Sequence, residues 1–75
     1  MKYLVIEIQT NKDGTVGNLV FAYDTLAQAE SKYHAVLSYA ALSELPVHAA
    51  VLLRSDGASL ASEFYEREQE QEAVE

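Results

Sequence analysis

The chain has 75 residues, no cysteine and a formal net charge of −7, with 49% hydrophobic and 23% charged residues. This length makes one domain, and the lack of cysteine excludes disulfides and thiolate metal sites. No apolar run approaches the roughly eighteen residues of a membrane span, and the first two residues lead into a strand pattern rather than a signal peptide. We therefore expect a cytoplasmic protein that does not bind membranes.

The negative charge is concentrated at the end of the chain. Residues 66–75 hold five glutamates and one arginine, a net charge of −4, which leaves −3 for residues 1–65. An acidic balance argues against direct nucleic-acid binding, which depends on lysine and arginine at the phosphates. We predict one folded domain over residues 1–65 and an acidic, disordered tail over residues 66–75.

The first predicted strand covers residues 2–10, where apolar and polar residues alternate. Asp13-Gly14 then predicts a hairpin with a two-residue type I′ turn. Counting outward from this turn predicts three cross-strand pairs, which are Ile8 with Leu19, Ile6 with Phe21 and Leu4 with Tyr23. A bulge at Gly17 would shift this register by one residue.

A helix is predicted over residues 24–44. Thr25 and Gln28 fit a capping box at its start, and Pro46 ends it near residue 43 or 44. One stripe of the helix is apolar and consists of Leu26, Ala29, Tyr33, Val36, Leu37 and Ala40. This stripe is the face that we expect to pack on a sheet.

A second hairpin follows, with an apolar strand over residues 47–54 and a turn at Asp56-Gly57. The turn predicts pairs of Leu53 with Leu60, Val51 with Ser62 and Ala49 with Phe64. We therefore predict an α+β fold of the ββαββ type, with a four-stranded antiparallel sheet in the order 2-1-3-4 and one helix on one face. The predicted core under the helix is Leu4, Ile6, Ile8, Leu19, Phe21, Val51, Leu53, Leu60 and Phe64.

The other face of this sheet is also apolar, and no second helix is predicted to cover it. Its residues would be Tyr3, Val5, Val20, Ala22, His48, Ala50, Leu52, Ala61 and Tyr65. An exposed patch of this kind is typical of an interface, so we expect a homo-oligomer or a partner protein there. The predicted interface residues are Tyr3, Val5, Val20, His48, Ala50, Leu52, Arg54 and Tyr65, with Tyr39 on the outer side of the helix. The two edge strands offer a second route, by strand addition.

No motif in the sequence predicts catalysis. The two histidines, His34 and His48, lack the spacing of a zinc site, and the serines lie outside any nucleophile elbow. We therefore expect no enzyme activity, no metal and no cofactor. A small nucleotide at a subunit interface is an alternative ligand, gripped by Lys2, Tyr3, His48, Arg54 and Tyr65.

Four segments, residues 1–10, 13–20, 29–37 and 46–52, give the chain a likeness to known sequences up to about Tyr65. In these segments it resembles a group of small accessory proteins of tailed phages and prophages of gut bacteria. The resemblance implies a phage protein made in the host cytoplasm. By analogy with other compact phage proteins, it would inhibit or sequester a host-defence factor or its nucleotide signal. The alternatives are a virion or assembly component, and an acidic mimic of nucleic acid that uses the tail.

Overall fold

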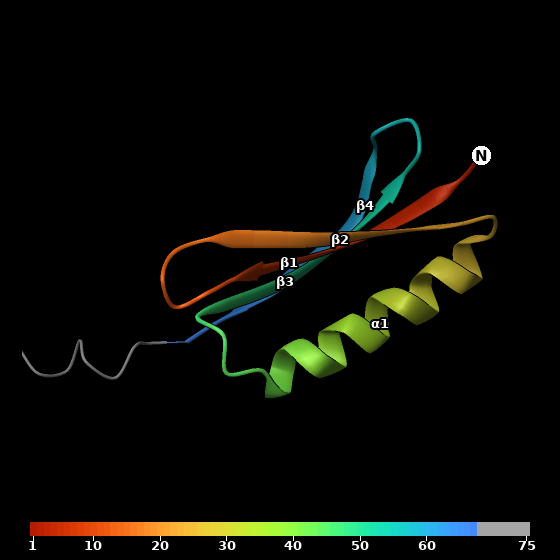
Figure 1. The fold of residues 1–75 in the computed structure, drawn as a ribbon. Coiled ribbons are helices and arrows are strands. Elements are labelled where there is room, and N and C mark those ends of the chain that lie inside the picture. Colours follow the sequence, from red (N-terminus) through yellow and green to blue (C-terminus); the bar gives the residue numbers. More distant parts are fainter. Residues whose placement is uncertain (68–75) are drawn as a thin grey trace, which may run out of the picture.

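The computed structural model describes residues 1–67, which form one antiparallel sheet and one helix. The elements are β1 (Tyr3–Thr10), β2 (Val16–Tyr23), α1 (Leu26–Leu42), β3 (Val47–Arg54) and β4 (Ser59–Glu66). The strand order is β2-β1-β3-β4, and each neighbouring pair is antiparallel. Figure 1 shows α1 lying along one face of the sheet. The predicted α+β fold and its strand order are confirmed.

The loop between β1 and β2 differs from the predicted turn. The Gly14 N–H donates to the Asn11 oxygen (2.9 Å), and the Asn11 N–H donates to the Thr15 oxygen (2.8 Å). Gly14 has a φ of 92°, so the loop is a three-residue type, a turn followed by a left-handed glycine. As a result Ile6 lies opposite Val20 rather than Phe21. The predicted register is wrong by one residue, through the loop and not through a bulge at Gly17.

The loop between β3 and β4 has the same design. The Gly57 N–H donates to the Arg54 oxygen (2.9 Å), and Gly57 has a φ of 97°. An irregularity between Leu52 and Leu53 then restores the expected alignment. Two predicted pairs, Val51 with Ser62 and Ala49 with Phe64, are confirmed, whereas Leu53 pairs with Ser59 and not with Leu60.

The helix follows its sequence signals closely. Thr25 is the N-cap, and its hydroxyl accepts from the Gln28 N–H at 3.2 Å. The helix ends at Leu42, before the C-cap Ser43, as expected from Pro46. Its buried residues are Ala29, Tyr33, Val36 and Ala40, all members of the predicted stripe. Among residues 1–67, no helix has both the length and the apolar character needed to cross a lipid bilayer.

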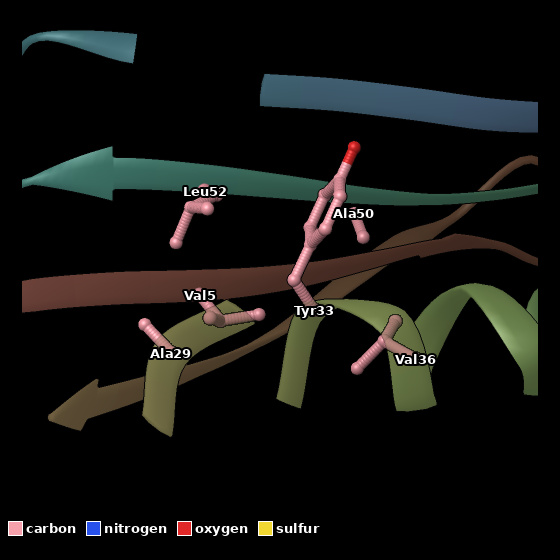
Figure 2. Close-up of a cluster of buried hydrophobic side chains, with 6 residues drawn as sticks. All are labelled: Val5, Ala29, Tyr33, Val36, Ala50 and Leu52. Carbon is pink, nitrogen blue, oxygen red and sulfur yellow. The ribbon is translucent and has the colours of Figure 1, made fainter. Parts of the chain in front are cut away.

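The hydrophobic core lies between α1 and the sheet, as Figure 2 shows. The core residues are Val5, Ala29, Tyr33, Val36, Ala50 and Leu52. The prediction of which face the helix covers is therefore wrong, because Val5, Ala50 and Leu52 were assigned to the outer face. The packing gives the physical reason. The Tyr33 ring rises from α1 toward the sheet beside Ala50, whose small side chain leaves room for it (Figure 2).

This correction inverts the predicted core, because side chains alternate between the two faces of a sheet. Leu4, Ile6, Ile8, Val51 and Leu53 share the face that points away from α1. Phe21 remains on the helix side, because it pairs with Val5 and packs against the core. Leu19 pairs with Glu7 on the same side and is 53% exposed.

Candidate interaction surface

The face of the sheet opposite α1 is the most apolar surface of the chain, and we call it the open face. It consists of the even-numbered residues of β1 and β2, the odd-numbered residues of β3 and their partners on β4. Its largest side chains are Leu4, Ile6, Ile8, Val51, Leu53 and Phe64. No helix of the described chain lies over it (Figure 1).

Exposure on the open face is greatest at its two outer strands. Phe64 is 63% exposed, Val20 57% and Leu60 44%, whereas the residues of β1 and β3 are half-buried by their neighbours. Among the described strand residues of this face, only Glu66 carries a charge, and it lies at the end of β4. The open face is therefore aliphatic on its two central strands, with the uncharged polar residues Asn18 and Ser62 on the outer strands and its charge at the margin.

The structure places most of the predicted interface residues elsewhere. Val5 and Ala50 are 0% exposed, Leu52 3% and His48 5%. All four lie beneath α1, so they are not available to a partner in this fold. Tyr3 is half-buried and packs against the same core cluster. The prediction that these five residues form an outer surface is wrong, because it depended on the wrong choice of face.

The other predicted interface residues are at the surface. Val20 lies on the open face, and Tyr39 is 68% exposed on the outer side of α1. Tyr65 is 38% exposed on the helix side of β4, and Arg54 forms an ion pair with Asp56 at the second turn. These four residues are spread over different faces and do not make one site.

The predicted nucleotide grip is not assembled. His48 is buried under α1, and the Lys2 ammonium group pairs with Asp24. Arg54 is likewise paired with Asp56. The cationic groups proposed to hold a phosphate are therefore paired with carboxylates or, for His48, closed off from solvent.

A buried polar cluster lies between the helix and the sheet. The His48 Nε2 atom is 2.7 Å from the Glu7 Oε2 atom, which also accepts from the Gln9 side-chain amide at 2.9 Å. The two side chains of the pair are only 6% and 12% exposed. Burial raises the pKa of the Glu7 carboxyl, but the hydrogen bonds from His48 and Gln9 outweigh it, with help from the charge of Lys32. The pKa of Glu7 is consequently lowered from its usual value, so this cluster is a structural tie between β1 and β3.

A second set of contacts joins Arg67 to the C-terminal end of α1. The Arg67 guanidinium donates to the backbone oxygens of Ala40 (2.7 Å) and Ala41 (2.8 Å) and lies 5.9 Å from the centre of the Tyr65 ring. The Arg67 N–H donates to the Pro46 oxygen at 2.8 Å. The sequence prediction placed Glu66 and Arg67 in the disordered tail, yet Glu66 belongs to β4 and Arg67 contacts the helix. The rest of that predicted tail, residues 68–75, lies outside the described residues.

Within residues 1–67, no three side chains of histidine, aspartate or glutamate come together as a metal-binding group. Comparison of the chain with protein-family models, curated proteins and solved structures finds no match. In the part of the chain that the structure describes, the open face is the feature that the packing of a single chain does not explain.

Proposed function

We propose that the chain is a non-enzymatic binding protein that acts as a homo-oligomer and inhibits or sequesters a host factor. The observation that supports this proposal is the open face. Aliphatic side chains exposed to water are unfavourable by about 25 cal/mol per Å² of apolar surface. A face with almost no charge is therefore most stable when another molecule covers it.

The size of this face supports a binding role. Strands about 4.8 Å apart and residues about 3.3 Å apart give four eight-residue strands an area of about 500 Å². This is near the upper end of the range for the largest apolar patch on a soluble monomer, and patches of that size are often functional. The open face thus has the dimensions of a contact surface.

A protein target fits better than a nucleotide signal. The side chains expected to grip a nucleotide are paired or buried, whereas the surfaces that remain are apolar or main-chain surfaces suited to protein contacts. The resemblance to phage accessory proteins supplies the context of a host factor, including a defence factor, as the target.

The test is affinity capture from lysate of a gut bacterium, with quantitative mass spectrometry. An open-face variant carries Val20→Lys together with Phe64→Lys, two residues that are 57% and 63% exposed in one subunit. The matched control is Leu42→Lys, because Leu42 is 86% exposed on the helix. We expect the wild type and the control to retain the same host protein and the open-face variant, in which the homo-oligomer is disrupted, to lose it. Equal capture by all three proteins, or no capture, would contradict the proposal.

The two alternative functions have their own readouts. Mass spectrometry of purified virions would detect the chain in stoichiometric amounts if it were a structural component. An acidic mimic of nucleic acid would lose its activity when residues 66–75 are deleted, whereas a binding protein that uses the open face would keep it. The open face favours the binding protein over the acidic mimic, which does not require an aliphatic face, and mass spectrometry of virions decides between the binding protein and a structural component.

A further inference from the structure

We infer that the molecule covering the open face is a second copy of this chain, packed sheet against sheet with both helices on the outside. The inference deepens the proposed function by naming the partner at that surface. It makes one subunit an incomplete structure, since the core of the assembly would lie between two sheets. Four observations support this arrangement.

The first observation is the composition of the open face. Its central strands contribute leucine, isoleucine, valine and alanine, which is the composition of a domain core. Permanent homomeric interfaces resemble a core cut in half, whereas interfaces in general are enriched in aromatic residues, methionine and arginine, of which the open face has only Phe64 among its strand residues. The tyrosines of this chain lie instead on the helix side of the sheet or on the helix itself. The open face therefore has the composition of a permanent contact between copies.

The second observation is the distribution of charge. Residues 1–67 carry eight acidic and five basic side chains, a net charge of −3, so the charged surfaces of two copies do not attract each other overall. The open face is different, because its only charged strand residue, Glu66, lies at one corner. A foreign partner with a basic surface would find no complementary carboxylates in the middle of this face. A second copy meets it without opposing like charges.

The third observation is area. Two faces of about 500 Å² together bury about 1,000 Å², which reaches the lower limit for a specific protein interface. A single helix of 17 residues covers the other face of the sheet. A domain this small gains a large share of its stability from any further burial.

The fourth observation is the centre of the face. Ile6 and Val51 are direct cross-strand partners on the two central strands, near the middle of both. In a sandwich of two aligned sheets about 10 Å apart, a two-fold axis between the layers would pass beneath this pair. The bulkiest aliphatic residues, Leu4, Ile8 and Leu53, surround it. The geometry therefore supports self-complementary packing about Ile6 and Val51.

The competing site for a second copy is the free edge of β2. The Asn11–Thr15 hydrogen bond and the alternation of antiparallel pairs direct the Asn18 and Val20 amides away from β1. The sequence of β2 contains no charged residue and no proline, the usual protections of an edge. Edge pairing would extend the sheet but would leave both open faces exposed, so we favour the face-to-face contact.

Light scattering after size exclusion distinguishes these arrangements. The variants are the open-face variant, Ile6→Lys at the centre of the face, Leu42→Lys as surface control, and Asn18→Pro, which removes an outward amide of β2. Far-UV circular dichroism checks that each variant folds. We expect the open-face variant to fold, because both of its substituted residues are already exposed in one subunit. At about 100 μM, a dimer with a Kd of about 1 μM would be almost fully formed.

We expect a mass about twice the 8.3 kDa of one chain for the wild type, Leu42→Lys and Asn18→Pro. The open-face variant and Ile6→Lys are expected to have the mass of a monomer. A monomeric wild type would overturn the inference, as would a folded open-face variant that remains dimeric. A monomeric Asn18→Pro together with a dimeric open-face variant would assign the contact to the β2 edge and would also overturn it.

The same proteins separate this inference from the proposed function. A monomeric wild type that still captures a host protein through the open face would refute the second copy and retain the binding function. A dimer that depends on the open face but captures no host protein would retain the second copy and refute the function.

Discussion

Arg67 provides the sharpest test of how the described fold is held together. Its guanidinium donates to the Ala40 and Ala41 oxygens at 2.7 and 2.8 Å, in the last turn of the helix, where the Ala40 oxygen also accepts from the Ser43 N–H at 3.2 Å. The last turn of α1 contains no basic residue, so Arg67 supplies the positive charge at this end of the dipole. We predict that Arg67→Gln destabilises the protein although residue 67 lies beyond the last strand.

The expected loss can be estimated from these contacts. A hydrogen bond from a charged donor contributes about 1.5–3 kcal/mol when well buried, and a charge at a helix end about 0.3–1 kcal/mol. One of the two bonds is partly buried and the other is exposed, so we expect a total loss of about 1–2 kcal/mol. For a domain of this size, each kcal/mol corresponds to a shift of about 4–8 °C in the melting temperature.

Urea unfolding followed by circular dichroism measures this loss directly. The matched control is Arg54→Gln, which removes a partly exposed ion pair with Asp56 within a turn and should change the stability less than Arg67→Gln, because solvent screens exposed pairs. Arg67→Lys should retain the charge but lose the two-pronged geometry, and we expect it to lie between the wild type and Arg67→Gln. If Arg67→Gln unfolds at the same urea concentration as Arg54→Gln, the proposed tie between the chain end and the helix is refuted.

Three further predictions concern the core, the buried cluster and the turns. Leu52→Ala should reduce the free energy of unfolding by about 2–5 kcal/mol in urea titrations, because Leu52 is 3% exposed beneath α1. The pKa of Glu7 is lowered from its usual value of 4.5, so its stabilising effect is full above that pH and is lost as the pH falls through the folded pKa. Unfolding measured at pH 7 and pH 3 should therefore show a smaller difference between the wild type and Glu7→Gln at pH 3. Gly57→Ala should cost about 1–2 kcal/mol in thermal melts because of its φ of 97°, whereas Gly17→Ala, with no atom within 4 Å of the added carbon, should be neutral or slightly stabilising.

The elements of the fold could be predicted from local signals. Thr25 and Pro46 limit the helix, and the two Asp-Gly pairs fix the positions of the hairpins. The register of β1 with β2 could not be predicted in the same way. Two- and three-residue loops use the same glycine signal but align the strands one residue apart. In β3 and β4 the irregularity beside Leu53 compensates for that difference, and for this reason the pairs Val51–Ser62 and Ala49–Phe64 were predicted correctly.

The sequence predicts one apolar sheet face without a covering helix, but the structure leaves the opposite face uncovered. Alternation identified two apolar sets of residues on the sheet, and the sequence alone offered only hydrophobicity to choose between them. Glu7, Gln9 and His48 seemed unsuited to a core, yet a hydrogen-bonded cluster lets all three lie on the helix side. Arg67 was assigned to a tail because its partners are carbonyls of a helix 26 and 27 residues away, contacts that leave no sequence pattern.

The wrong choice of face has a physical explanation. Apolar periodicity in a sequence reports all the burial that a strand experiences, and it does not distinguish a covering helix from a covering subunit. In this chain the more aliphatic set, with Ile6 and Val51 at its centre, faces away from α1, while the helix covers a face that contains the hydrogen-bonded side chains of Glu7, Gln9 and His48. Burial of the aliphatic face under α1 would stabilise a single chain more than burial of the face that α1 covers. In the sheet-to-sheet dimer that we propose, the strongest hydrophobic signal of the sequence would belong to a contact between two chains.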